Sequence, residues 1–208
     1  MQDQIAAFLA TLGPADADPA ALYVVWAGAN DFFLLLGGVG SPEELIAGGV
    51  ANTVQAIQLL RQAGARHILV LNVPDLGLTP LGLASGMSDV ITAMVMVYNQ
   101  TLAAALQALA AAGTPTIHVD AFSVLQSMVN HAADHGFTNV TEPALLVGAD
   151  PAQFLFWDFV HPTTRGHEIL AREALDQLVQ HFLPARGVGL PPARINALRG
   201  LVRAGRPR

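Results

Sequence analysis

The sequence predicts an α/β protein in which helices cover both faces of a parallel β-sheet. Short apolar, strand-like runs alternate with longer amphipathic segments along the 208 residues, the order expected of strand–helix–strand units. The strand-like runs are continuously apolar, as in strands that are buried on both faces. Hydrophobic residues make up 52% of the chain and charged residues only 12%, a composition that excludes disorder for most of it.

The expected elements follow one another in a regular order. Helices are expected over residues 4–12, 41–63, 89–112, 122–133 and 163–182, and strands over residues 22–26, 68–73 and 116–119. The second helix has the clearest start, because Ser41 fits an N-cap, Pro42 the first helical position and Glu44 the third, as in a capping box. Residues 136–160 lack a regular pattern and are expected to form a long loop, of a kind that is often functional.

Charge is distributed unevenly along the chain. The ten basic residues are all arginines, and six of them lie in the last 23 positions. All 16 acidic residues lie within residues 1–185, which contain only four arginines, so this part carries a formal charge of −12. Nucleic-acid binding through phosphate neutralisation is therefore excluded for the body of the chain. Residues 1–184 are predicted to form one domain, and residues 185–208 a basic Arg-, Pro- and Gly-rich tail that is expected to be disordered.

Three further features limit location and chemistry. No apolar run reaches the roughly 20 residues of a bilayer span, so no membrane span is expected. The chain has no cysteine, which excludes disulfides and thiolate metal sites. Met1 is followed by Gln-Asp-Gln rather than by a basic and then an apolar stretch, so no signal peptide is visible and the location is left open.

The first candidate for chemistry is the run Gly28-Ala29-Asn30-Asp31, directly after the strand at 22–26. In parallel sheets, ligands bind beyond the carboxyl ends of the strands. A glycine permits a sharp turn there, and the Asn30 amide can donate a hydrogen bond to an oxyanion that develops in acyl transfer. Taken alone, the run is explained more simply by an Asx turn in which Asp31 caps the next segment.

The second candidate is Asp158-Phe159-Val160-His161-Pro162, just before the last expected helix. Three residues apart in a turn, Asp158 can accept a hydrogen bond from one imidazole nitrogen of His161 and leave the other nitrogen free as a base. Pro162 restricts His161 to extended conformations. In isolation, a helix-capping Asp158 beside an incidental histidine is an equally good interpretation.

Together the two runs resemble the SGNH, or GDSL, esterase/lipase superfamily. Gly28–Asp31 matches its G-x-N-D block, and Asp158–Pro162 matches its D-x-x-H-P block. Further similarities, in the same order, are found at residues 72–80, 98–102, 136–140 and 156–158. The last two of these resemble the phospholipase/lecithinase/hemolysin-like branch, and the whole resemblance covers about residues 3–183.

The resemblance implies a three-layer α/β/α, flavodoxin-like fold. It also implies carboxylic ester hydrolysis through a Ser-His-Asp acyl-enzyme mechanism, without a metal or cofactor. In that mechanism His161 would be the general base, Asp158 would orient it, and Asn30 would be the oxyanion donor. Gly28 and Asp31 would hold supporting positions, and the substrate would be an ester-containing small molecule or lipid.

The Gly-Asp-Ser block, in which this family keeps its nucleophilic serine after the first strand, is not in the sequence. None of the five serines follows a buried strand in such a context. The resemblance therefore implies that the nucleophile and the first two strands are missing, and we expect the carboxy-terminal portion of a longer, exported hydrolase that is inactive alone. The strand at 22–26 would then be a sheet edge, which favours self-association.

Two other interpretations stay open. The chain could be a non-catalytic homologue that binds acyl or glycan ligands, or a subunit that a partner carrying the serine completes. A separate pair, His131 and His135, has the spacing of metal ligands on a helix. Without a third ligand at suitable spacing, solvent-exposed surface histidines are the preferred explanation for that pair.

Overall fold

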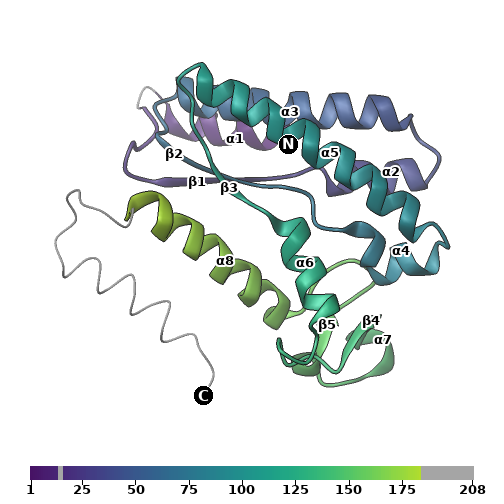
Figure 1. Cartoon of the computed structure of the whole chain (residues 1–208). Helices are drawn as coiled ribbons and strands as arrows, with labels where there is room; N and C mark the ends of the chain where they lie inside the picture. The colour runs from purple at the N-terminus through teal and green to yellow at the C-terminus, as the bar shows by residue number, and fades with distance from the viewer. Residues whose placement is uncertain (14–15, 184–208) are drawn as a thin grey trace.

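A three-stranded parallel sheet lies between two layers of helices in the computed structural model, which describes residues 1–13 and 16–183 (Figure 1). The strand order is β1 (Leu22–Trp26), β2 (His67–Leu71) and β3 (Ile117–Val119). Leu22 is paired with His67, and Leu69 with Ile117. The predicted parallel α/β sheet flanked by helices is confirmed, and the predicted strand at 22–26 has the observed bounds.

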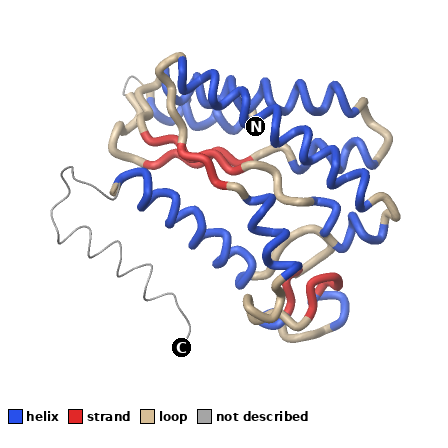
Figure 2. The backbone as a smooth tube through the Cα atoms, viewed as in Figure 1, coloured by secondary structure: helices blue, strands red, loops and turns tan. Residues whose placement is uncertain are grey.

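The remaining elements surround this sheet (Figure 2). The helices are α1 (Gln2–Leu12), α2 (Ala29–Leu36), α3 (Pro42–Gln62), α4 (Pro80–Ala84), α5 (Ser88–Ala111), α6 (Ala121–Asn130), α7 (Ala144–Val147) and α8 (Thr164–Phe182). Two short 3-10 helices, η1 (Leu76–Leu78) and η2 (Pro151–Gln153), and two strands of a second small parallel sheet, β4 (Asn139–Pro143) and β5 (Phe154–Phe156), complete the described part. The expected basic tail lies outside the described residues.

The two faces of the main sheet are covered by different helices. Val25, Ile68 and Val70 belong to a core that α1, α3 and α5 cover on one side. Leu69 and Val119 belong to a core on the opposite side, against which α8 packs. Because side chains alternate between the faces of a strand, this division produces the three layers that the continuous apolar strands predicted.

Helix α5 is the most apolar of the long helices. Its length and hydropathy would also suit a membrane span. In the fold, however, it lines the core with a row of buried side chains: Ile91, Val95, Tyr98, Leu102, Leu106 and Leu109. Their spacing of three, four and seven residues is typical of a core-facing helix, which accounts for its hydropathy.

Strand β1 is an edge strand within the described part of the chain, because only β2 pairs with it. Leu22, Val24 and Trp26 are 42%, 58% and 43% exposed, and only Val25 is buried. The expectation of a strand buried on both faces is therefore wrong for this strand. The cause is that α8 packs against β2 and β3 and does not cover the face of β1 that carries Leu22, Val24 and Trp26.

Two segments are more regular than the sequence predicts. The run at 28–31, expected as a loop, begins helix α2, whose continuous apolar residues give no helical period. The expected loop at 136–160 contains the small sheet of β4 and β5 and helix α7. These strands are three to five residues long, too short for alternation to stand out from sequence.

The starts of two long helices, α3 and α8, are predicted correctly. The Ser41 hydroxyl oxygen accepts a hydrogen bond from the Glu44 backbone N–H, and the Glu44 carboxylate accepts one from the Ser41 backbone N–H. This is the predicted capping box, with Pro42 at the first helical position. Thr163 caps α8 through a hydrogen bond from the Gly166 backbone N–H. Both caps satisfy backbone donors that a helix start leaves unpaired. Because few residue types can do this, the caps can be recognised in the sequence.

Asparagine side chains join the segments that follow the strands. Asn99 on α5 accepts a hydrogen bond from the Val73 N–H at 3.0 Å and donates one to the Val73 C=O at 2.8 Å. Asn72 donates to Asp120 at 2.8 Å and accepts from the Phe122 N–H at 3.0 Å, which connects the segments after β2 and β3. The carboxyl edge of the sheet is thus fixed by side-chain hydrogen bonds as well as by strand pairing.

We predict that Asn99→Ala destabilises the fold by about 2–4 kcal/mol, because it leaves the fully buried Val73 backbone with an unpaired donor and acceptor. Urea denaturation followed by circular dichroism measures the change. The neighbouring Gln100→Ala, at an exposed position of the same helix, is the control and should change stability by less than about 0.5 kcal/mol. Equal effects of the two variants would contradict the role of Asn99.

Candidate active site

A cavity of about 630 Å³ lies at the carboxyl end of β1. Residues 26–31 line one part of it, and residues 160–162 line another. Further walls come from α1, α3, α6 and the first turn of α8. The two candidate runs, about 130 positions apart in sequence, therefore meet in one cavity where the rule for parallel sheets places ligands.

Gly28 makes the turn from β1 into α2. Its φ is 113°, a conformation that side chains other than hydrogen rarely adopt. A Cβ atom at this position would also lie 2.7 Å from the Tyr98 hydroxyl oxygen and 2.9 Å from a Val73 methyl carbon. The turn therefore requires glycine for two independent reasons.

Asn30 and Asp31 lie in the first turn of α2, and both line the cavity. The Asn30 side chain is exposed, and its amide makes no hydrogen bond to any described residue. Gly28, not Asp31, holds the N-cap position, so the alternative in which Asp31 caps the segment is wrong. An acidic side chain in the first turn instead interacts favourably with the helix dipole.

Tyr98 packs against the turn at Gly28. It is not among the site residues predicted from the sequence. Its side chain is fully buried, and its ring packs edge-on against Phe32 of α2 at 5.7 Å between centroids. Burial raises the pKa of the Tyr98 hydroxyl, which stays protonated near neutral pH. The similarity at residues 98–102 includes Tyr98 but gives it no role.

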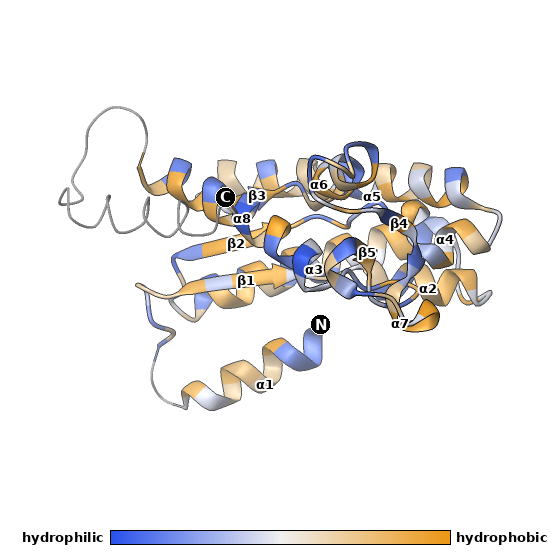
Figure 3. Ribbon diagram, turned by 90° about the horizontal axis from the view of Figure 1, so that it is seen from below, coloured by the Kyte–Doolittle hydropathy of each residue, from blue (hydrophilic) through white to orange (hydrophobic). Residues whose placement is uncertain are grey.

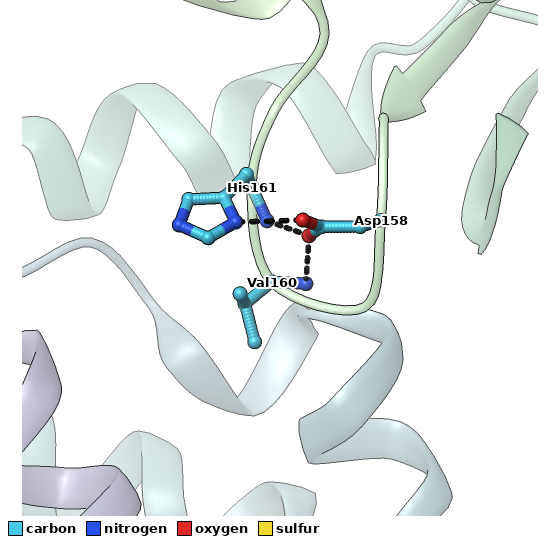
Figure 4. Close-up of polar contacts among 3 residues, drawn as sticks. All are labelled: Asp158, Val160 and His161. Atoms are coloured by element: carbon cyan, nitrogen blue, oxygen red, sulfur yellow. Dashed lines mark hydrogen bonds and ion pairs between the residues drawn. The ribbon is translucent and has the colours of Figure 1, made fainter. Parts of the chain in front are cut away.

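Asp158 and His161 form the hydrogen-bonded pair that their spacing predicts (Figure 4). The Asp158 Oδ2 atom lies 2.8 Å from His161 Nδ1. The other carboxylate oxygen accepts hydrogen bonds from the backbone N–H groups of Val160 and His161, at 2.8 and 2.7 Å. The carboxylate thus closes the turn and holds the imidazole. The alternative of a helix-capping Asp158 beside an incidental histidine is wrong, because Thr163 caps α8.

The electrostatics of Asp158 follow from these contacts. Burial by itself would raise the pKa of Asp158, but the hydrogen bonds from the His161 and Val160 backbones and from the His161 ring outweigh it. The pKa of Asp158 is therefore lowered, and the side chain is a carboxylate at neutral pH. In this form it can accept a hydrogen bond from Nδ1–H, which leaves the lone pair of a neutral imidazole on Nε2.

The loop that carries this pair is held at both ends. The Trp157 N–H donates to the His161 C=O at 2.8 Å, and the Thr163 N–H donates to the Leu155 C=O at 2.8 Å. The Phe159 C=O accepts from the Leu81 N–H of α4 at 2.9 Å. His161 itself has a side chain that is 70% exposed, and its Nε2 has no hydrogen-bond partner among the described residues. His161 is also one of the residues that line the cavity.

No serine is among the residues that line the cavity. All five serines lie in described segments, and each makes a local hydrogen bond. Ser41 and Ser123 take part in helix starts, Ser85 and Ser88 donate to the Gly82 and Gly77 carbonyls, and Ser127 contacts His135 at 3.1 Å. That these serines supply no nucleophile stays a prediction.

The second histidine pair does not form a metal site in the described residues. His131 ends α6, and His135 lies in the following turn, so the two do not share a helix as their spacing suggested. No group of three or more His, Asp or Glu side chains in residues 1–13 and 16–183 is placed to hold a metal ion. His135 is half-buried and bonded to Ser127, which corrects the expectation of a freely solvated side chain.

Comparison with known proteins gives consistent matches. An uncharacterized protein in the trpE-trpG intergenic region of Pseudomonas putida is 33% identical over 172 residues, covering 74% of this chain and 28% of the relative. An Arabidopsis thaliana GDSL esterase/lipase is 28% identical, with coverage of 61% and 41%, and the thermolabile hemolysin of Vibrio parahaemolyticus is 25% identical, with coverage of 74% and 40%. The chain thus spans less than half the length of these relatives.

The family profile described as GDSL-like lipase/acylhydrolase matches residues 1–174. This match covers the whole main sheet, the cavity and both candidate runs. The chain belongs to the GDSL-like lipase/acylhydrolase family, a family of ester hydrolases.

Proposed function

We propose that this chain provides the base and oxyanion-binding parts of a carboxylic ester hydrolase that works through an acyl-enzyme. His161 is the general base, Asp158 orients it, and Asn30 donates a hydrogen bond to the oxyanion. The observation that carries the proposal is the 2.8 Å contact between Asp158 and His161 Nδ1, in a loop that shares one cavity with Asn30.

The proton transfer follows from the hydrogen bonds of the pair. With Nδ1 donating to the carboxylate, Nε2 of His161 can take the proton of a serine hydroxyl as the oxygen attacks the ester carbon. The imidazolium that forms is stabilised by the Asp158 carboxylate and returns its proton to the leaving alcohol. Water then enters by the same route and releases the acid.

The start of α2 suits the negative charge that develops on the carbonyl oxygen. Gly28, Ala29 and Asn30 all line the cavity, so the positive end of the α2 dipole lies at its wall. The Asn30 amide is unengaged within the described residues and needs no rearrangement to donate to that oxygen. Pre-placed donors of this kind stabilise the transition state more than the ground state.

The serine is proposed to come from a segment that is not among these 208 residues. The open edge of β1 supports this proposal, because a further parallel strand beside β1 would end next to Gly28 and Asn30. Without that strand, the chain is proposed to be inactive, and its open edge is proposed to mediate self-association.

To test the function, the amino-terminal segment of a family member that contains Gly-Asp-Ser is fused ahead of Met1, which gives a joined protein. We expect the joined protein to react with a fluorophosphonate probe and to hydrolyse p-nitrophenyl butyrate, whereas the 208-residue chain does neither. In the joined protein, His161→Ala should lower kcat by about 10³-fold or more and Asn30→Ala by about 10²-fold.

The same assay separates this function from the alternatives. His67→Ala, at a histidine outside the cavity, is the matched control for His161→Ala and should leave kcat unchanged. Turnover that survives His161→Ala, or turnover by the 208-residue chain without any added segment, would contradict the proposal. A folded joined protein that binds ester analogues without reacting would favour the non-catalytic binding module.

We predict that the Asp158 carboxylate stabilises the fold only above its acid titration range. Because its pKa is lower when folded, the stabilisation is complete above the unfolded value of about 3.9 and is lost as the pH falls through the folded pKa. The difference between the wild type and Asp158→Asn, measured by urea denaturation, should be about 1 kcal/mol or less at pH 6 and smaller at pH 3, since the side chain is 35% exposed. A difference that grows as the pH falls would rule out this role.

Self-association of the 208-residue chain has its own test. Val24 is 58% exposed on the open strand, and Val24→Lys places a charge there that discourages pairing. Sedimentation velocity should show a concentration-dependent increase in mass for the wild type and a monomer for Val24→Lys. A wild type that stays monomeric up to a concentration about 100-fold above that of the esterase assay would refute association through β1.

A further inference from the structure

Asp75 is a buried acidic side chain that the proposed mechanism does not use. It is 1% exposed, and it is not among the residues that line the cavity. Its Oδ1 atom accepts hydrogen bonds from the Thr92 hydroxyl at 2.6 Å and from the Gly77 N–H at 3.2 Å, and Oδ2 accepts one from the Gln126 side-chain amide at 3.0 Å. All three donors are neutral, and neutral hydrogen bonds at best offset the cost of burying an acidic group. Asp75 therefore fixes one arrangement of its neighbours rather than adding to stability.

The three donors belong to three different elements. Gly77 lies in η1, Thr92 on α5 and Gln126 on α6. Their common acceptor thus connects the segment after β2 to both helices. The fit is close, because a Cβ atom at Gly77 would collide with the Thr92 hydroxyl and the Ser88 carbonyl oxygen. The Ser88 hydroxyl also donates to the Gly77 C=O at 2.8 Å, so helix η1 is held in one position against the start of α5.

From η1 the connection continues into α4. The Thr79 hydroxyl donates to the Leu76 C=O at 2.7 Å and accepts from the Gly82 N–H at 3.1 Å, which joins η1 to the first turn of α4. The Leu81 N–H in that turn donates to the Phe159 C=O at 2.9 Å. Helix α4 also contacts β4, beside which it lies in Figure 1 and in Figure 3. The buried carboxyl group is thus linked through α4 to the loop of the catalytic pair.

The contact between α4 and this loop has no equivalent in the described part of the chain. The other hydrogen bonds of residues 158–161 stay within residues 157–161. These bonds set the shape of the loop, whereas its place beside the cavity also depends on the contact with α4. Among the described residues, the bond from Leu81 to Phe159 is the one that ties residues 158–161 to a segment that follows a strand of the main sheet.

We propose that Asp75 is a positioning residue for His161. By fixing η1 and α4, it holds the loop so that the imidazole lies within reach of the serine hydroxyl. The inference rests on the proposed function for the role of His161 as general base. A base has to lie within hydrogen-bond reach of the proton that it takes, and a displacement of about 1 Å can cost a large part of the rate. Because Asp75 does not line the cavity, its loss should slow the proton transfer without weakening substrate binding.

Amide hydrogen exchange in the 208-residue chain tests the connection without catalysis. Thr92→Val removes the shortest hydrogen bond to Asp75 and keeps the shape of the side chain. Exchange at the Leu81 and His161 N–H groups should then rise about five-fold, because both hydrogen bonds open more often when η1 is loosened. Exchange in β2, which reports opening of the sheet, should stay unchanged.

Thr101→Val is the matched control for this variant. It is the same substitution on the same helix, but the Thr101 hydroxyl donates to the Val97 C=O of α5 itself at 2.8 Å. Exchange at Leu81 and His161 should change less than about two-fold. Equal responses to Thr92→Val and Thr101→Val, or a rise in β2 as large as at Leu81, would overturn the inference.

Kinetics of the joined protein test the consequence for catalysis. Asp75→Ala should lower kcat about ten-fold and change KM less than about two-fold. Asp75→Asn should stay within about three-fold of the wild type, because the Gln126 amide can turn over and accept from the new amide group. Asp150→Ala is the control: Asp150 caps η2 through the Ala152 N–H at 3.0 Å, as Asp75 caps η1, and its loss should leave kcat unchanged.

These kinetics separate positioning from stability. A change in KM that equals the change in kcat, or a kcat of Asp75→Ala that matches the wild type, would overturn the inference. If Asp75→Ala does not fold, Thr92→Val decides in its place and should lower kcat about three-fold at unchanged KM. An inactive joined protein, with Leu81 exchange that still responds to Thr92→Val, would contradict the proposed hydrolysis and not the connection, so the two failures are distinguishable.

Discussion

Parallel pairing of β1, β2 and β3 is the constraint on which the rest of the structure depends. It requires the chain to return across the sheet after every strand, so all three segments that follow a strand leave from the same edge. Strand pairing alone does not fix those segments, because their backbone groups lie past the last hydrogen bonds between the strands. The side chains of Asn72 and Asn99 supply the missing partners, and the ring of Tyr98 fills the space that Gly28 leaves. These contacts connect the segments that form the site to one another and to α5.

Sequence patterns predicted the long elements because each has a cause that acts locally. The Ser41 capping box and the row of apolar side chains on α5 are examples. Sequence patterns failed for elements that form only through tertiary contacts. Helix α2 follows its strand directly with no helical period, and the strands β4 and β5 exist through pairing with each other. The exposure of β1 depends on which strands and helices lie beside it, and the five residues of β1 do not indicate which those are.

The candidate site divides in the same way. The Asp158–His161 contact was predictable because both partners lie in one turn, where a spacing of three residues nearly determines the geometry. That the pair shares a cavity with Asn30 could be expected only from the edge rule for parallel sheets together with the family resemblance. The similarity at residues 98–102 includes Tyr98 but does not report its packing against the turn at Gly28, and the cavity walls from α1 and α3 have no characteristic residue pattern.

The exposure of His161 sets a condition on its chemistry. With 70% of its side chain in solvent, the attraction between an imidazolium and the Asp158 carboxylate is largely screened, since water reduces the energy of a charge pair many-fold relative to a protein interior. A general base gains most when its pair is desolvated as the charge develops. A strand beside β1 would cover one side of the cavity and a bound acyl chain another, so both would help to exclude water from the pair. The base and the open edge are therefore linked through one requirement, which is a low dielectric around His161 at the moment of proton transfer.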